Sequence, residues 1–380
     1  MAGPLRGLKV VELAGIGPGP MAGMLLANLG AEVIQIERPG SADIGIEMPP
    51  EFELFNRGKE KLSLDLKDPA AIEALLGLLE QADVLIEGYR PGVLERLGLD
   101  PAVCHARNPR LVIARMTGWG NQGIMAKSAG HDLNYIALSG VLAAIGARDG
   151  KPAIPHNLVG DFGGGSLYLV FGIMSALFER QTSGRGQVVD AAMIDGVASL
   201  STSMFAQHAA GLMNLDRASN LLDGGTPYYD VYRCADGQWL SVAPLEPKFF
   251  ALLIKTLGLD AGWIARQHDR AAWPELRTVF TECFAQRTRD EWSALLGHLD
   301  VCVAPVLNLD EAPHHAHHAS RGTYAAIPAG SNSMLAPAPA PRFDRTPAAA
   351  TLVTIDQPDP GATLRRWGVA EQAIQFALLT

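Results

Sequence analysis

The sequence predicts an α/β protein with two domains: a large one built on a doubly wound, Rossmann-like parallel sheet, and a smaller α+β domain. In the first half, short apolar segments alternate with helix-like segments, which is the pattern of parallel strands joined by crossover helices. From about residue 221 the pattern changes to a hairpin followed by amphipathic helices. We therefore expect a large domain over 1–190 and 323–380, a linker helix within 191–220, and a small domain over 221–322.

The large domain is predicted from repeated strand and helix segments. A strand over residues 8–13, a glycine-rich turn, a helix over 21–29 and a strand over 31–36 form one βαβ unit. A second cycle follows, and a last strand closes this half of the chain. These later elements are strands at 62–66, 84–87, 111–116 and 187–191, with a helix over 68–81.

The second half is predicted from its turns and helix caps. A long helix over 195–214 without a strong charged face suits a position between domains or subunits. The turn at 235–237 predicts a hairpin whose second strand is 238–243. The pair Thr288 and Glu291 predicts a capping box for a helix. The remaining elements are helices at 247–257, 271–285, 289–299 and 370–378, and strands at 301–306 and 322–327, the terminal helix returning to the large domain.

Composition limits the class of protein. With 380 residues, of which 48% are apolar, the chain can bury a large core and a smaller second one. A net charge of −9 argues against nucleic-acid binding. The four cysteines are scattered, which argues for a reducing compartment. No signal peptide is visible, and apolar runs such as 168–178 are too short or too interrupted by glycine to span a bilayer. We expect a cytoplasmic protein with neither membrane nor nucleic-acid partners.

Two segments carry candidate catalytic side chains. His131 and Asp132 precede one apolar helical run, and Asp161 precedes a glycine triplet and a second apolar run. A helix N-terminus offers unpaired backbone N–H groups and a partial positive charge. An oxyanion between two such ends would be stabilised while His131 and Asp161 exchange protons with the bound molecule, and the N–H of Asp132 is the candidate donor. This arrangement suits enolate chemistry.

Glu246 is a candidate partner for His131. It directly follows the second hairpin strand, a position from which it can project from the small domain towards a cleft. A carboxylate beside an imidazole selects one tautomer and makes the ring a stronger base.

The turn at 15–22 partly fits the glycine fingerprint of dinucleotide-binding proteins, and Glu37 could hold a ribose. Pro18 and Pro20, however, remove two backbone donors from the loop where a pyrophosphate would bind. A tight turn between strand and helix is therefore favoured over an NAD site.

A histidine cluster at 314–318 raises the question of a metal site. It has few nearby carboxylates, no cysteine partner and a proline-flanked setting, so we expect an exposed loop and no metal.

Cationic side chains follow the predicted strands of the large domain. These are Arg38, Arg57, Lys59, Lys67, Arg90 and Arg96, and ligands of open α/β sheets bind at the carboxyl ends of the strands. Together these residues suit a nucleotide with separated phosphates.

The sequence resembles the family III CoA-transferases and racemases over nearly its whole length. Within that family, residues 130–135 and 245–249 are similar to the branch of α-methylacyl-CoA racemases, and the glycine-rich loop of the transferase branch is not found. Residues 44–53, in an early loop, depart from the family pattern. The motifs that carry the resemblance are residues 5–14, 37–40, 64–67, 83–92, 114–120, 160–165, 190–196, 321–324 and 339–343.

The resemblance implies a racemase that acts on 2-methylacyl-CoA by 1,1-proton transfer, with the CoA thioester as substrate and no further cofactor. It also implies an interlocked homodimer in which each site takes its small domain from the partner chain. The implied bases are His131, supported by Glu246, and Asp161; Asn157 and Tyr229 lie near them, and Arg38, Lys67 and Arg96 contact CoA.

Two alternatives stay open. In a family III CoA-transferase, Asp161 would be a nucleophile that forms a mixed anhydride. A non-catalytic acyl-CoA-binding protein is the third interpretation, and the presence of both His131 and Asp161 counts against it.

Overall fold

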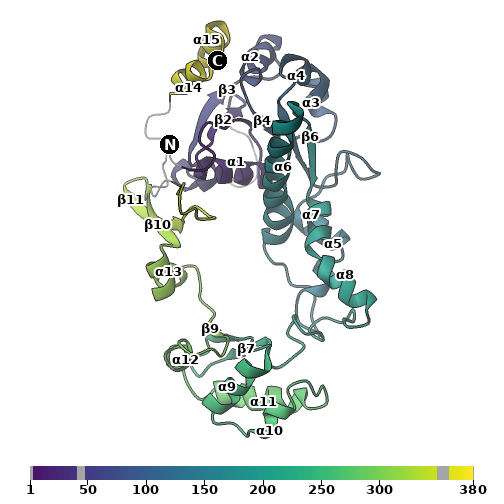
Figure 1. Ribbon diagram of the computed structural model, residues 1–380, viewed down its shortest axis with the longest axis vertical. Coiled ribbons are helices and arrows are strands. Elements are labelled where there is room, and N and C mark those ends of the chain that lie inside the picture. The colour runs from purple at the N-terminus through teal and green to yellow at the C-terminus, as the bar shows by residue number, and fades with distance from the viewer. Residues whose placement is uncertain (1–2, 41–47, 349–358, 380) are drawn as a thin grey trace. The chain divides into compact units, whose positions relative to one another are not determined.

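The computed structural model describes residues 3–40, 48–348 and 359–379 (Figure 1). The chain forms two compact units. The first contains residues up to 139, residues 156–200 and the chain from 316 onward, and the second contains 140–155 and 201–315. Part of the unusual early loop, residues 44–47, lies outside the described residues; its continuation forms two short 3-10 helices, η1 (Pro50–Phe52) and η2 (Leu54–Asn56).

The described part of the first unit contains the expected parallel sheet. Its strand order is β3-β2-β1-β4-β5-β6, and every neighbouring pair is parallel. The carboxyl ends of all these strands therefore lie at one edge, and the direction of winding reverses between β1 and β4. The strands are β1 (Lys9–Leu13), β2 (Glu32–Glu37), β3 (Lys59–Ser63), β4 (Val84–Glu87), β5 (Val112–Thr117) and β6 (Val188–Ala192).

Helices cover both faces of this sheet (Figure 1). One face packs on α2, α3, α4 and the two C-terminal helices, which confirms that the end of the chain returns to the large domain. The other face packs on α1, α5 and α6. The helices of this unit are α1 (Pro18–Asn28), α2 (Pro69–Leu79), α3 (Val93–Arg96), α4 (Pro101–Arg107), α5 (Asp132–Leu138), α6 (Leu167–Ser183), α7 (Met193–Leu200), α13 (Ala316–Arg321), α14 (Pro360–Trp367) and α15 (Glu371–Leu379).

The sequence-based placement of β3 is wrong by three residues. The apolar pattern predicts a strand at 62–66, whereas the strand begins at Lys59 and ends at Ser63. Lys59 is only 5% exposed because it pairs with the buried Glu12 of β1, so it is not one of the cations available to a nucleotide. A charged residue that is neutralised inside the core carries no apolar signal, so the pattern misses the start of this strand.

The predicted long helix over 195–214 is also wrong. The structure has two shorter helices there, α7 and α8 (Thr202–Ala209). They are separated at Ser201, which is buried and has backbone angles of φ −88° and ψ 6°, outside the α-helical region.

The helical segment that contains Asp161 differs from the expected helix start. Residues Leu158–Ser166 form a π-helix, η4, which continues directly into α6. The combined segment Leu158–Ser183 is long and apolar enough to cross a membrane by length and composition alone, longer than the sequence pattern suggests. Its residues Leu169, Ile173 and Leu177 are buried against the sheet.

The second unit confirms the predicted hairpin and capping box. Its antiparallel sheet has the order β7-β8-β9, and Glu291 and Thr288 cap α12 reciprocally. Aromatic side chains such as Phe250, Phe280 and Phe284 form its core. The elements are β7 (Asp230–Arg233), β8 (Trp239–Val242), β9 (Val303–Pro305), α8, α9 (Pro247–Thr256), α10 (Gly262–Ala265), α11 (Trp273–Phe284) and α12 (Arg289–Leu296).

The hairpin β10 (Tyr324–Ala329) and β11 (Asn332–Pro337) belongs to the first unit. Arg57 Nη1 donates to the Pro337 carbonyl at 3.1 Å, which ties this hairpin to the segment before β3.

Candidate active site

The turn between β1 and α1 forms one side of the candidate site. It lies at the carboxyl edge of the sheet, beside the point where the winding reverses. Gly17 has φ +69°, and a Cβ atom there would lie 3.2 Å from Oδ2 of Asp161. Glycine is therefore required both by the left-handed backbone and by the close approach of the carboxylate. A carboxylate over this turn would repel a pyrophosphate, which agrees with the preference against an NAD site.

Asp161 is held at its carboxylate, at its N–H and at its carbonyl, which accepts from Ser166 Oγ at 3.2 Å. Asn157 Nδ2 donates to Oδ2 of Asp161 at 3.0 Å, and the Asp161 N–H donates to Oδ2 of Asp132 at 2.8 Å. Burial raises the pKa of the Asp161 carboxyl, while the hydrogen bond from Asn157 lowers it. The negative charge of Asp132 raises this pKa further, and the charge of His131 lowers it. Asp161 is thus a stronger base than an ordinary aspartate.

His131 and Asp132 stand at the start of α5, as predicted. Asp132 is the first helical residue, so its N–H has no acceptor within the helix. The His131 N–H donates to Oδ1 of Asn134 at 3.0 Å, and the His131 residue is exposed. The structure therefore brings together His131, Asp132, Asn157 and Asp161, four of the residues that sequence reasoning selected.

Sequence reasoning missed the aromatic pair that holds α5. The rings of Trp119 and Tyr135 meet edge to face with centroids 4.7 Å apart, and the Tyr135 hydroxyl donates to the Gly130 carbonyl. A Cβ on Gly118 would lie 2.1 Å from the Tyr135 ring. This packing fixes the residues just before His131. The available signal was the combination of aromatic residues with nearby glycines, which leave room for rings.

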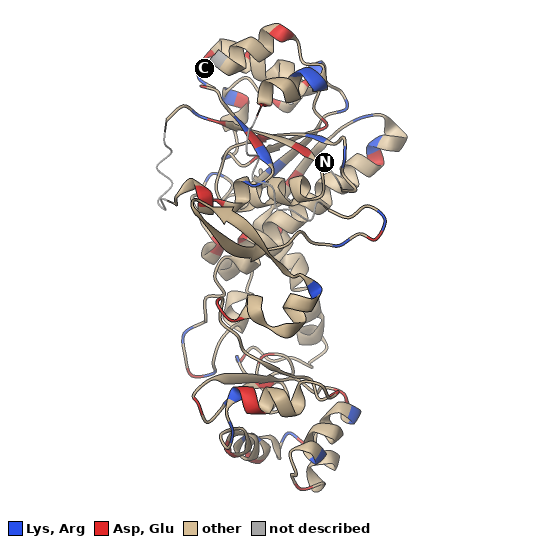
Figure 2. Cartoon of the chain, turned by 90° about the vertical axis from the view of Figure 1, so that its left-hand side faces the viewer, with Lys and Arg blue, Asp and Glu red and all other residues tan. Residues whose placement is uncertain are grey.

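The expected CoA-binding cations lie at the carboxyl edge. Arg38 follows β2, Lys67 follows β3, and Arg96 lies in α3 after β4; all three are exposed. Figure 2 shows Lys and Arg interspersed with Asp and Glu over the chain, so these residues provide local rather than general positive charge.

Arg90 is a fourth cation at this edge, and its charge affects Tyr135 of α5. Burial raises the pKa of Tyr135, and the negative charge of Asp161 raises this pKa further. The positive charge of Arg90 lowers it. The loop before Arg90 is anchored by Glu87, which accepts hydrogen bonds from Tyr89 N–H at 2.8 Å and Arg115 Nε at 2.6 Å.

Glu246 and Tyr229 belong to the second unit. Glu246 is the exposed N-cap residue of α9, and Tyr229 is half-buried just before β7. Their proposed association with His131 stays a prediction.

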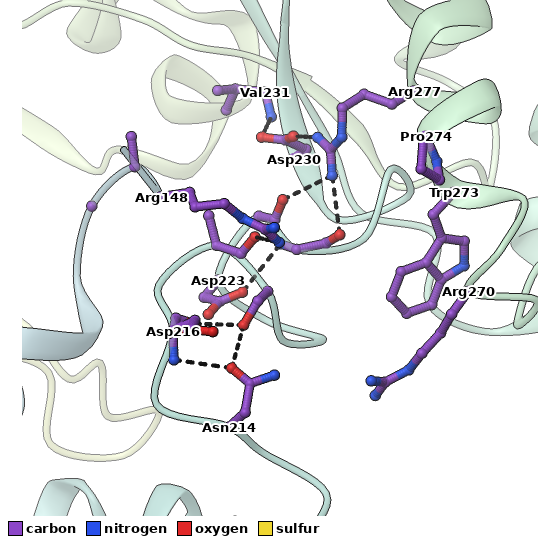
Figure 3. Close-up of a pocket in the computed structure, with 16 residues that line it drawn as sticks. Arg148, Asn214, Asp216, Asp223, Asp230, Val231, Arg270, Trp273, Pro274 and Arg277 are labelled. Carbon is purple, nitrogen blue, oxygen red and sulfur yellow. Dashed lines mark hydrogen bonds and ion pairs between the residues drawn. The ribbon is translucent and has the colours of Figure 1, made fainter. Parts of the chain in front are cut away.

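A cavity of about 970 Å³ lies within the second unit (Figure 3). Arg277 pairs with Asp230 at its wall and donates to the carbonyls of Gly224 and Gly225. None of the predicted site residues lines this cavity. Within residues 3–40, 48–348 and 359–379, no group of three or more His, Cys, Asp or Glu side chains is arranged to hold a metal ion.

Comparison with known proteins identifies relatives over nearly the full chain. Residues 5–362 match the family model described as CoA-transferase family III. The α-methylacyl-CoA racemase of Mus musculus is 43% identical over 376 residues, which covers 97% of this chain and 95% of that protein. The racemase of Homo sapiens is 42% identical and covers 90% and 87%. A CaiB/BaiF family protein from Brucella suis, solved by crystallography, superposes with a TM-score of 0.79 at 28% identity, covering 96% and 99%.

The raised pKa of Asp161 predicts that this residue lowers the stability of the fold at neutral pH. The folded protein holds the Asp161 proton more tightly than the unfolded chain, so ionisation favours unfolding once the pH exceeds the ordinary value of 3.8. Asp161→Asn should therefore raise the melting temperature at pH 7, and this gain should shrink as the pH falls towards 4. Asp149→Asn, at an exposed aspartate, is the matched control and is measured over the same pH range. A gain for Asp161→Asn that does not depend on pH would contradict the assigned pKa direction.

Proposed function

This chain belongs to CoA-transferase family III, and from that premise we propose that it is an α-methylacyl-CoA racemase, which interconverts (R)- and (S)-2-methylacyl-CoA thioesters. The observation that carries the proposal is the juxtaposition of His131 and Asp161, two side chains able to act as bases, at the carboxyl edge of the sheet. The names of the mouse and human relatives support it. Such an enzyme would act in lipid metabolism, and we propose a cytoplasmic location.

The reaction requires two bases on opposite faces of the α-carbon. One base removes the α-proton, the C–H electron pair forms the C=C bond of an enolate, and the carbonyl π pair moves onto the oxygen. The protonated form of the other base then delivers a proton to the opposite face. A single base would return the proton to the face from which it came. One C–H bond breaks and one forms, so no oxidant or reductant is required, and we propose no cofactor beyond the CoA thioester itself.

The enolate oxygen requires a hydrogen-bond donor. We assign this role to the backbone N–H of Asp132, which stands at the start of α5 without an acceptor inside the helix. The Asp132 carboxylate is directed to the Asp161 N–H instead, so it supports the second base rather than the oxyanion. Losing one such donor typically costs about 3 kcal/mol of transition-state stabilisation.

The CoA moiety would bind along the carboxyl edge. Arg38, Lys67 and Arg96 are exposed there and suit the separated phosphates of CoA. Tyr229 of the second unit is proposed to lie near the acyl group. No nucleic-acid or membrane partner is proposed.

The exposed face of α6 supports a homodimer. Leu167, Phe171, Met174 and Phe178 recur at helical spacing and are 53%, 70%, 37% and 75% exposed. A continuous apolar stripe of this kind is typical of a protein interface. We propose that a second copy of this chain covers it, in an interlocked dimer whose second units complete the sites.

A family III CoA-transferase is the second candidate, because the matching family model is that of CoA-transferases and Asp161 is an accessible carboxylate. In that reaction Asp161 attacks the thioester carbonyl and CoA leaves, which gives a mixed anhydride. An acceptor carboxylate would then be required for turnover.

Isotope exchange distinguishes these candidates. The native enzyme in D2O should incorporate deuterium at the α-carbon from pure (R) and pure (S) 2-methylacyl-CoA, without a second substrate. Asp161→Asn should lose inversion by at least about 100-fold, while His131 still exchanges one enantiomer. His131→Gln is the matched variant and should retain exchange of the other enantiomer only. Equal residual exchange from both enantiomers would refute the two-base assignment, and a rate that depends on an added carboxylate would establish the transferase.

Glu246→Gln tests the proposed support of His131. Turnover should fall about 10-fold with KM nearly unchanged, because the carboxylate acts through the imidazole and does not hold the nucleotide. The limb of the pH–rate profile that reports the ionisation of the His131 base should shift. Lys248→Gln, two residues away on α9, is the control and should leave both unchanged. An unaltered turnover and profile in Glu246→Gln would remove this residue from the mechanism.

The dimer is tested by a charge on the apolar stripe. Phe171→Glu should dissociate the dimer in sedimentation, because burying an unpaired carboxylate in an apolar interface is strongly unfavourable. Val103→Glu is the control, since Val103 is an exposed apolar residue of α4, on the other face of the sheet. A native protein that sediments as a monomer, or a Phe171→Glu variant that remains dimeric, would contradict the proposal.

A further inference from the structure

The first turn of α1, next to Gly17, is held by two buried side chains. Ser166 Oγ donates to the Pro18 carbonyl at 2.9 Å, and Lys59 Nζ donates to the Pro20 carbonyl at 2.8 Å. Ser166 has no exposed surface, and the Lys59 side chain has none either. The turn that meets Asp161 is thus attached to the π-helix through Ser166 and to the sheet through Lys59.

Lys59 belongs to a buried polar cluster on three neighbouring strands. Its ammonium lies 2.8 and 2.7 Å from the two carboxylate oxygens of Glu12, and Gln35 Nε2 donates to Glu12 Oε1 at 2.6 Å. Glu12 and Gln35 are direct neighbours in the register of β1 and β2. A Cβ on Gly23 would lie 1.8 Å from Glu12 Oε2, so α1 packs directly on this cluster.

The cluster is an unfavourable way to fill a core. Removing a carboxylate and an ammonium from water costs several kcal/mol per ion, and well-packed apolar residues are often at least as stabilising. What distinguishes the cluster from apolar packing is a directional hydrogen bond: the Lys59 ammonium extends from the sheet and donates to a single carbonyl of α1, that of Pro20. An apolar core would allow α1 to shift along the sheet, whereas this hydrogen bond sets its position.

The position of α1 determines what lies against Asp161. Gly17 is the N-cap residue of α1, and its Cα borders the Asp161 carboxylate. A Cβ on Gly165 would lie 3.0 Å from Pro18 Cβ, so the π-helix and the first turn of α1 are in tight contact. A displacement of this turn would therefore move or hydrate the Asp161 carboxylate. His131 lies on α5 and has no contact with Lys59 among those described.

We propose that Lys59, fixed by Glu12 and Gln35, is a positioning residue for Asp161: it sets the first turn of α1 on which the carboxylate of this base rests. This inference rests on the proposed function for its catalytic consequence, although its structural part can be measured independently.

The test replaces the whole cluster. Lys59→Met alone would leave Glu12 buried without a partner and could prevent folding. The triple variant Glu12→Met, Gln35→Leu, Lys59→Met removes the charges together and retains an apolar core. Ser166→Ala removes the second attachment of the same turn, but it also removes the contact of Ser166 Oγ with the Asp161 carbonyl at 3.2 Å, so it serves only as a supporting variant. The matched control is Asp83→Asn, Arg180→Met: Arg180 also pairs with a carboxylate and donates to a backbone carbonyl, but Asp83 precedes β4, at the opposite edge of the sheet.

Two readouts are expected to change together. Backbone hydrogen–deuterium exchange, followed by mass spectrometry, should become faster in residues 14–24 and 157–167 of the triple variant but not of the control. Deuterium uptake from the enantiomer that depends on Asp161 should slow on the order of 10- to 100-fold, as expected for a displacement near 1 Å. KM for the thioester should stay within about 2-fold, and uptake from the enantiomer that depends on His131 should slow much less than uptake from the other, because His131 is joined to this turn only indirectly, through the hydrogen bond from the Asp161 N–H to Asp132.

The outcomes separate the two proposals. Unchanged amide exchange in 14–24 and 157–167 would overturn the positioning role, whatever the activity. Faster amide exchange with equal slowing of both enantiomers would also overturn it, because the effect would then be general. If the native protein exchanges neither enantiomer, the racemase proposal fails, and amide exchange still decides whether Lys59 holds the turn.

Discussion

The hydrogen bond from the Asp161 N–H to the Asp132 carboxylate is the contact on which the candidate site depends. It joins two segments that are 29 residues apart and places the start of α5 beside the π-helix. Close packing makes this bond possible, since a Cβ on Gly160 would lie 2.4 Å from the same carboxylate oxygen. The glycines around Asp161 therefore serve to let two helical segments approach.

The π-helix is equally tightly packed against α7. A Cβ on Gly164 would lie 2.7 Å from Val197 of α7, and one on Gly196 would lie 1.9 Å from the Gly164 carbonyl. The backbone of η4 thus packs closely on α5 and α7, and its glycines place no side chain of their own at these contacts. π-helical turns are uncommon and cluster at functional sites. Here the wider turn carries the carboxylate that rests over Gly17, so local backbone geometry and chemistry are coupled.

Burial raises the pKa of carboxylates inside the sheet as well as that of Asp161 in the site. Glu12 and Glu87 both have a pKa raised chiefly by burial, and each is opposed by a cation, Lys59 or Arg115. Each pair also fixes a segment at the carboxyl edge: the first through Pro20 and the second through the Tyr89 N–H. The charged residues inside the sheet are therefore organised around the two loops that flank the switch point. Their hydrogen bonds set loop positions that apolar packing would leave free.

The sequence by itself determined the parallel sheet, the hairpin of the second unit and the choice of His131, Asp132, Asn157 and Asp161. Asn157 is implied by the resemblance to the family; the others follow from local signals: apolar periodicity, turn residues, caps and polar residues at helix starts. Tertiary structure alone decided the start of β3 at Lys59, the break at Ser201, the π-helix around Asp161 and the packing of Tyr135 on Trp119. The start of β3 and the close packing of the π-helix depend on partners distant in sequence, such as Glu12 for Lys59 and Gly196 for Gly164. Local patterns report what a residue prefers, whereas a buried charge or a glycine contact is favourable only because of the atom placed opposite it, and that atom is set by the fold.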